Sequence, residues 1–180
     1  ETILCLDEAY SDFVDKSDLV SINVEKENLI RFRTFSKAYG LAGLRVGYGI
    51  GNNKLVKAFN KVRNHFGVNK LGQIAAKVAL EDQKHLKNVL KKVEKSKNNI
   101  AAIFKKFGFT SLASRTNFVP INSGGDDNFA AKLMTSLIQE KIFVRIPSVS
   151  PLNSFIRITA GTNDDLIVLE EAMNKIIKKI

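Results

Sequence analysis

The segment from Thr34 to Arg45 combines residue types that suit one kind of chemistry. Lys37 follows directly on an apolar, strand-like run and is surrounded by small residues. Thr34 and Ser36 place hydroxyls three residues and one residue before it, and Arg45 lies eight residues after it. A lysine amine held partly desolvated in a cleft is available as a nucleophile, and hydroxyls with a guanidinium can hold a phosphate. The segment therefore favours a lysine that binds a phosphate-bearing ligand covalently.

Two other segments carry groups of the same kind. Asp7 and Tyr10 stand where an apolar run gives way to a polar stretch. Arg157 lies in a strand-like run, and strand alternation places it on the same face as Phe155 and Thr159. Taken singly, the ordinary interpretations are a turn acid and a half-exposed strand arginine, since charged residues are mostly exposed. Asp7, Tyr10 and Arg157 indicate a functional site only when they are considered together.

The elements that must position these residues indicate an α/β protein. Short apolar runs separated by loops and amphipathic segments are typical of a sheet whose ligands bind at the carboxyl ends of its strands. The expected strands are 1–6, 29–35, 45–50, 118–121, 142–146 and 154–160, and the expected helices are 53–64, 69–82, 83–107, 129–141 and 164–179. Gly108 is expected to end the long helix, and Thr162 with Asp165 forms a capping-box pattern before the last one.

The order of these elements predicts two domains and a partial chain. After the long helix, the sequence strand, helix, strand, strand, helix is that of a small α+β domain, so the boundary is expected within this helix, giving domains 1–88 and 89–180. The opening run of residues 1–6 is typical of a strand covered on both faces of a parallel sheet. Because such a strand needs neighbours, we interpret the chain as part of a longer protein.

Composition excludes several classes of protein. With 44% hydrophobic and 26% charged residues in 180, the chain is expected to be globular, and no apolar run is long enough for a membrane helix. The net charge of +10 allows a nucleic-acid partner, but the lysines follow amphipathic segments such as 84–106, which favours a solvated face and no nucleic acid. The single cysteine, Cys5, fits a reducing cytoplasm, and His65 and His85 are too sparse for a metal site.

Longer motifs carry a resemblance to a known family. Residues 34–38 resemble the cofactor-lysine signature of class I and class II aminotransferases, which reads Thr-hydrophobic-Ser-Lys-small, and residues 40–48 match its continuation. Residues 6–10 resemble the family's Asp-x-Ala-Tyr element and residues 155–162 its arginine element. The resemblance extends from Leu6 to about Met173. It implies a fold type I pyridoxal-phosphate enzyme: the carboxy-terminal part of a large, mostly parallel-sheet domain, followed by the small α+β domain.

The resemblance also implies roles for individual residues. The cofactor would be pyridoxal 5'-phosphate, bound covalently by Lys37, which is also the catalytic residue. The cofactor-binding residues implied are Asp7 at the pyridine nitrogen, Tyr10 at the phenolic oxygen, and Thr34, Ser36 and Arg45 at the phosphate. Arg157 would bind the carboxylate or phosphate of the substrate, with Arg145 and Asn117 as further candidate contacts.

Within the family, residues 33–38, 68–73 and 156–162 are most similar to histidinol-phosphate aminotransferases. This similarity implies transamination between histidinol phosphate and 2-oxoglutarate in histidine biosynthesis, by a cytoplasmic homodimer whose partners are a small-molecule amino donor and a 2-oxo acid. The alternatives are an aromatic-amino-acid aminotransferase and a threonine-phosphate decarboxylase. A further alternative is an inactive fragment or basic binding module, because the family's amino-terminal half supplies the glycine-rich phosphate loop and a ring-stacking aromatic residue.

Overall fold

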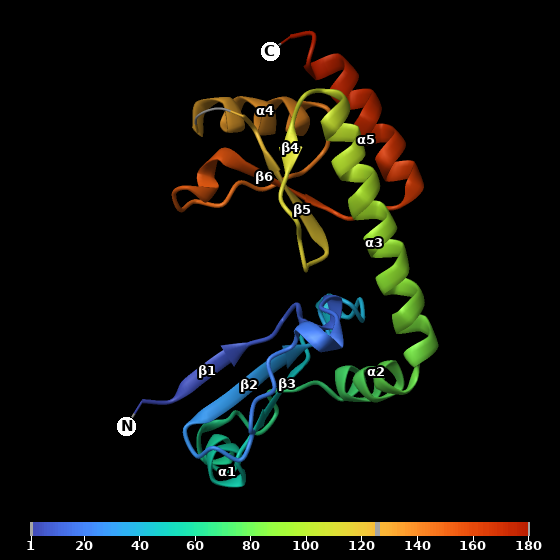
Figure 1. Cartoon of the computed structure of the whole chain (residues 1–180). Coiled ribbons are helices and arrows are strands. Elements are labelled where there is room, and N and C mark those ends of the chain that lie inside the picture. Colours follow the sequence, from blue (N-terminus) through green and yellow to red (C-terminus); the bar gives the residue numbers. More distant parts are fainter. Residues whose placement is uncertain (1, 125–126, 180) are drawn as a thin grey trace. The chain divides into compact units, whose positions relative to one another are not determined.

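A computed structural model describes residues 2–124 and 127–179 and divides the chain into two compact units, residues 1–90 and 91–180 (Figure 1). The strands and helices are β1 (Leu4–Asp7), β2 (Leu29–Thr34), β3 (Gly47–Gly51), α1 (Asn53–Val62), α2 (Lys70–Glu81), α3 (Gln83–Lys106), β4 (Thr110–Ser111), β5 (Phe118–Asn122), α4 (Asp127–Gln139), β6 (Phe155–Thr159) and α5 (Asn163–Ile176). Glu1, part of the expected opening strand, lies outside the described residues.

The first unit contains a three-stranded mixed sheet in the order β1-β2-β3. β1 and β2 are parallel, with Asp7 opposite Phe32, whereas β2 and β3 are antiparallel, with Thr34 opposite Gly47. The expectation of a mostly parallel sheet therefore holds for only one of these two pairings. The reason is the connection: residues 35–46 contain only the short 3-10 helix Ala42–Leu44, and a parallel return needs a longer crossover, usually with an α-helix.

The expected strand 45–50 begins later than the apolar pattern indicated. Arg45 adopts a left-handed conformation with φ of 54°, which no strand residue shares, so the strand starts only at Gly47. Glycine is required at that point because a Cβ at position 47 would lie 2.8 Å from the carbonyl oxygen of Arg33. The close approach lets β3 pair with β2 directly after the turn.

β1 differs from its expectation in burial. The sequence predicted a strand covered on both faces, but Leu4 is 56% exposed and Cys5 and Asp7 are exposed as well. The described part of the chain therefore leaves β1 uncovered. The apolar core of this unit is small and is centred on Phe35, Val46 and Ala76.

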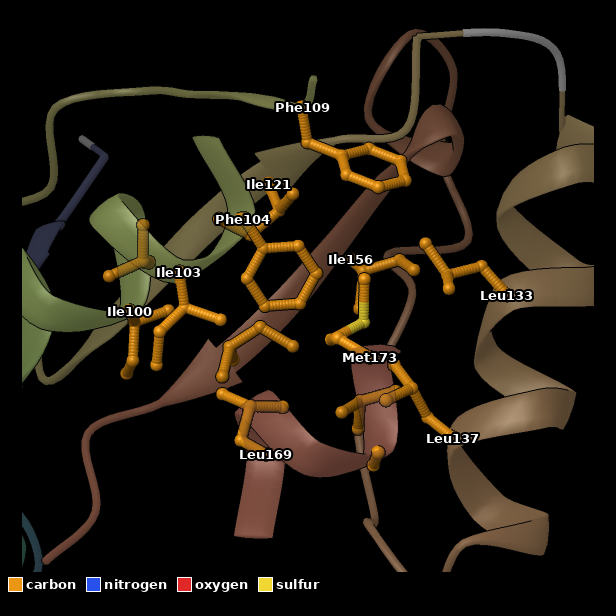
Figure 2. Close-up of a cluster of buried hydrophobic side chains, with 14 of the residues drawn as sticks. Ile100, Ile103, Phe104, Phe109, Ile121, Leu133, Leu137, Ile156, Leu169 and Met173 are labelled. Carbon is orange, nitrogen blue, oxygen red and sulfur yellow. The ribbon is translucent and has the colours of Figure 1, made fainter. Parts of the chain in front are cut away.

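The second unit has an antiparallel sheet in the order β4-β5-β6 and a large apolar core. Figure 2 shows side chains from α3, α4, α5 and the sheet converging on one another. The residues at its centre with no exposed surface are Ile100, Phe104, Ile121, Leu133, Leu137, Ile156 and Met173. Along β6 the buried residues alternate with half-buried ones, so Ile156 and Ile158 face the core while Arg157 lies on the opposite face, as predicted.

The expected strand 142–146 is wrong: the structure has one isolated bridge there, between Arg145 and Arg157. Pro147 follows and offers no N–H to a ladder, which limits pairing on that side. The short strand β4 was not expected because its two residues are exposed and show no alternation. The helix expected at 129–141 is α4, which ends at Gln139; Lys141 beyond it takes a left-handed conformation.

The helix signals were more reliable. The capping box before α5 is confirmed: the Thr162 hydroxyl accepts from the Asp165 N–H, and the Asp165 carboxylate accepts from the Thr162 N–H. Gly108 stops α3, with φ of +84° and its N–H donating to the carbonyl of Lys105. Across 2–124 and 127–179, no helix is both long and apolar enough to cross a membrane, and no three His, Cys, Asp or Glu residues are grouped as metal ligands.

We expect Ile156→Ala to lower the free energy of unfolding by about 3 kcal/mol, because it leaves a cavity at a fully buried position. Urea unfolding followed by circular dichroism measures the change. Val168→Ala, at a position on α5 that is 52% exposed, is the control and should change stability by no more than about 0.5 kcal/mol. Equal losses in the two variants would contradict the assigned core.

Candidate functional site

The first unit contains a hollow of about 490 Å³ beside the carboxyl ends of β1 and β2. Its lining includes five of the six residues expected to bind a cofactor, namely Asp7, Thr34, Ser36, Lys37 and Arg45. Tyr10, the sixth, lies nearby, with the centroid of its ring 5.3 Å from the Nζ of Lys37. The residues that the sequence separates by up to 38 positions therefore meet at one place.

Lys37 projects from a loop that is fixed at both ends. The N–H of Phe35 donates to the carbonyl of Val46 (3.2 Å), and the N–H of Leu41 donates to the carbonyl of Phe35 (2.9 Å). Phe35 and Ala38 on either side are buried, so the loop is anchored in the core while the Lys37 side chain is exposed. Its amine has no hydrogen bond or ion pair with any part of the chain that the structure describes. The backbone that carries Lys37 is thus held in place, and the Lys37 amine is available to a ligand.

Three further residues of the lining supply groups suited to an anion. The backbone N–H of Ser36 donates to the Thr34 hydroxyl (3.0 Å), which orients both residues at the end of β2. Arg45 donates from one terminal nitrogen to the carbonyl of Ala42 (2.8 Å), which fixes the guanidinium through its own turn and leaves its other N–H groups for a ligand. The left-handed turn at Arg45 therefore helps to determine where its guanidinium lies in the hollow.

Asp7 is placed by the end of β1. Its Oδ1 accepts the N–H of Ala9 at 3.0 Å, an Asx-type turn that fixes the carboxylate. The parallel register that pairs Asp7 with Phe32 brings it within reach of the residues that follow β2. A carboxylate, an amine and an anion-binding set thus share the hollow.

The sequence did not point to the ion pairs of Glu8, one of whose partners, Arg33, lines the hollow. The Glu8 carboxylate accepts from Arg31 at 2.6 and 2.9 Å and from Arg33 at 3.0 Å. Burial raises the pKa of Glu8, but the hydrogen bonds and charges of the two arginines outweigh it and leave the pKa below its usual value. Burial also raises the pKa of Asp12, a half-buried residue close to Arg33. The sequence offered only two signals: Arg31 and Arg33, two positions apart on an expected strand, and the distant acidic pair Asp7 and Glu8.

In the second unit, Arg157 and Arg145 face each other directly. They are opposite partners of the isolated bridge, and the N–H of Arg157 donates to the carbonyl of Arg145 at 2.7 Å. Directly paired residues of antiparallel strands share a face, and like charges there repel. Neither arginine has an acidic partner among residues 2–124 and 127–179. The pair therefore forms an unneutralised double positive charge.

The ring of Phe118 packs against one of these two cations. The Cζ of Arg157 lies 4.0 Å from the centroid of the Phe118 ring, a stacked cation–π contact. The Nε of Arg157 is buried and has no hydrogen-bond partner within the described ranges. The aromatic ring, and not a counter-charge, thus orients the guanidinium, and the cation is left able to bind an anion. Phe118 follows directly on Asn117, a candidate contact that the resemblance implies, and the structure adds its stacking on Arg157.

Asn117 lies at the same end of the sheet, where its carbonyl accepts the N–H of Ala160 at 2.9 Å. Two buried polar residues of α3 fix the surrounding loops. The Ser96 hydroxyl bonds to Gly161, and the amine of Lys97 donates to the carbonyl of Ser114 at 2.7 Å. Lys97 is thus an exception to the solvated face expected for the lysines of this helix.

Comparisons with known proteins show which family the chain resembles over most of its length. The model of the aminotransferase class I and II family matches residues 1–176. Histidinol-phosphate aminotransferase 1 of Cupriavidus pinatubonensis is 33% identical over 99% of this chain and 48% of its own length, and histidinol-phosphate aminotransferase 2 of Carboxydothermus hydrogenoformans is 36% identical over 90% and 45%. The chain spans about half the length of the curated relatives it matches.

A solved structure extends this similarity to the fold. Histidinol-phosphate aminotransferase from Sinorhizobium meliloti, determined in complex with pyridoxal-5'-phosphate, superposes with a TM-score of 0.95 and 41% identity over 98% of this chain and 49% of that one. The expected fold type I architecture is confirmed by this match. The chain belongs to the aminotransferase class I and II family.

Proposed function

We propose that this chain carries the lysine-bearing part of a pyridoxal-phosphate-dependent aminotransferase that transfers the amino group of histidinol phosphate to a 2-oxo acid such as 2-oxoglutarate. The observation that supports the reaction best is the exposed amine of Lys37 in a hollow shared with Asp7, Thr34, Ser36 and Arg45. The named relatives support the choice of substrate.

The groups of the hollow fit the cofactor. Pyridoxal phosphate carries an aldehyde, a phosphate and a basic ring nitrogen, which call for an amine, a set of N–H and O–H donors and a carboxylate respectively. Lys37 provides the amine, Arg45 with the Thr34 and Ser36 hydroxyls provides the donors, and Asp7 provides the carboxylate. When bound, the cofactor supplies an electron sink for the electrons released at the substrate carbon.

The residues of the chain would then share the remaining work. The Lys37 amine takes a proton from the substrate carbon as a general base and returns it as a general acid. The Asp7 carboxylate keeps a proton on the ring nitrogen by its negative charge. Tyr10, whose ring lies beside the Lys37 amine, would hydrogen-bond the phenolic oxygen. Each of these roles uses a group that lies in or next to the hollow.

Arg145 and Arg157 favour a doubly charged substrate group. Two cations that face each other without an acidic partner are best neutralised by a dianion, and a phosphate monoester carries up to two negative charges near neutral pH. A guanidinium also matches phosphate geometry by paired hydrogen bonds. The arginine pair is therefore the feature that favours histidinol phosphate over an aromatic amino acid, whose carboxylate carries one charge.

We further propose a cytoplasmic homodimer. The resemblance to the family supports the dimer, and the exposed thiol of Cys5, the one cysteine, fits a reducing compartment. Light scattering of the full-length enzyme measures its mass, and a monomer at working concentration would contradict the assembly.

In the full-length enzyme, we expect Lys37→Ala to abolish the visible absorbance that arises when pyridoxal phosphate condenses with a protein amine. The reason is that, among the residues that the structure describes, Lys37 is the one lysine in the lining of the hollow. Absorbance spectroscopy after cofactor addition measures this loss. Lys57→Ala, on the exposed surface of α1, is the matched control and should leave the spectrum unchanged. A normal spectrum in the Lys37 variant would overturn the assignment.

We expect Arg145→Gln to raise KM for histidinol phosphate about tenfold or more, since a hydrogen bond between charged groups is worth about 1.5–3 kcal/mol. The kcat should change little, because binding of the remote phosphate is the same before and during reaction. Steady-state kinetics with histidinol phosphate, threonine phosphate and phenylalanine measure both constants. Lys132→Gln on α4 is the control for loss of one exposed charge.

The same assay separates the alternatives. Turnover of phenylalanine but not histidinol phosphate would replace the proposed substrate by an aromatic amino acid, and release of carbon dioxide from threonine phosphate would indicate a decarboxylase. An unchanged KM for histidinol phosphate in the Arg145 variant would remove this residue from the substrate site.

A further inference from the structure

We infer that Glu8 is a positioning residue for the proposed reaction, fixing the Asp7 carboxylate that would pair with the cofactor's ring nitrogen. Glu8 is adjacent to Asp7 but is not part of the lining of the hollow. The inference rests on the proposed function and adds to it a residue that acts from behind the site.

The ion pairs of Glu8 differ from an ordinary surface pair. Arg31 approaches with two nitrogens, Nε at 2.9 Å and Nη2 at 2.6 Å, and Arg33 adds its Nε at 3.0 Å. The side chains of Glu8, Arg31 and Arg33 are 10%, 15% and 22% exposed. Fork-like pairing of this kind is directional as well as strong, and water screens it little. The carboxylate is thus held in one orientation against β2.

The backbone carries this restraint to the neighbouring residues. The N–H of Glu8 donates to the carbonyl of Phe32 at 2.9 Å, which continues the β1–β2 pairing one residue past Asp7. The carbonyl of Glu8 accepts the N–H of Ser11 at 3.0 Å, which closes the turn that contains Ala9 and Tyr10. Because successive strand side chains point to opposite faces, Glu8 points away from the face to which Asp7 points. Anchoring Glu8 therefore fixes the direction of Asp7.

Glu8 supplies a side-chain anchor for the segment that carries Asp7. The Asp7 carboxylate itself has one fixed contact, with the N–H of Ala9. The hydrogen bonds of Glu8 with Arg31 and Arg33 therefore add a buried, directional restraint next to Asp7.

A double-mutant cycle in the full-length holoenzyme tests the inference. We expect Glu8→Gln to lower kcat about ten- to a hundredfold, because small displacements of a catalytic group have effects of this size. The KM for histidinol phosphate should change little, since Arg145 and Arg157 are untouched. In an Asp7→Asn background, Glu8→Gln should change kcat by no more than about twofold, because the group it positions has already been altered.

Matched variants exclude a general loss of stability. Glu27→Gln breaks an exposed ion pair with Lys54 in the same unit and should leave kcat unchanged. If Glu8→Gln does not fold, Glu8→Asp, which keeps the charge with a shorter reach, takes its place in the same cycle and should show a smaller loss of kcat. Thermal unfolding of each holoenzyme verifies that the comparison is between folded proteins.

The outcomes separate this inference from the proposed function. An equal loss of kcat on changing Glu8 in the wild-type and Asp7→Asn backgrounds would overturn the positioning role and leave the proposed function intact. A rise in KM with unchanged kcat would overturn it as well. If Asp7→Asn alone leaves kcat unchanged, the proposed role of Asp7 fails, and the inference about Glu8 fails with it.

Discussion

The parallel pairing of β1 with β2 is the constraint on which the lysine-bearing site depends. Its register places Asp7 opposite Phe32, so the carboxyl ends of both strands open at the same edge. The residues that leave this edge are a carboxylate from one strand and the Lys37 loop from the other, which are 30 positions apart in the sequence. A shift of one residue would turn every side chain to the other face and separate them. The site is therefore a consequence of strand register before it is a matter of side-chain chemistry.

In the second unit, the apolar core determines on which face of the sheet Arg157 lies. Ile156 and Ile158 are buried on one face of β6, and this fixes Arg157 on the other face by alternation. The repulsion between Arg157 and Arg145 is tolerable because the core is large and because the Phe118 ring takes the place of a counter-ion for one of them. An acidic partner would stabilise the strand more but would compete with an anionic ligand. The arrangement favours binding at the expense of local stability.

The sequence predicted those features that depend on local pattern. The capping box at Thr162 and the stop at Gly108 are encoded within a few residues, and the motif around Lys37 is long enough to place the site lysine. The failures involved long-range geometry. The left-handed turn at Arg45 shortened an expected strand, and the strand expected at 142–146 proved to be a single bridge, because pairing depends on a partner that no local pattern describes. The stacking of Phe118 on Arg157 was not predicted, because a cation–π contact leaves no mark in composition.

The ion pairs of Glu8 also depend on long-range geometry that no local pattern describes. Its position in the acidic motif is visible in the sequence, but its partners lie on β2, more than twenty residues away, and two arginines spaced by two on a strand more often indicate a solvated face. Only the parallel register brings these three groups together next to the hollow, whose lining includes Arg33 but not Glu8. Register thus gathers both the proposed cofactor-binding groups and the ion pairs of Glu8. The two sets are coupled because they are carried by the same two strands.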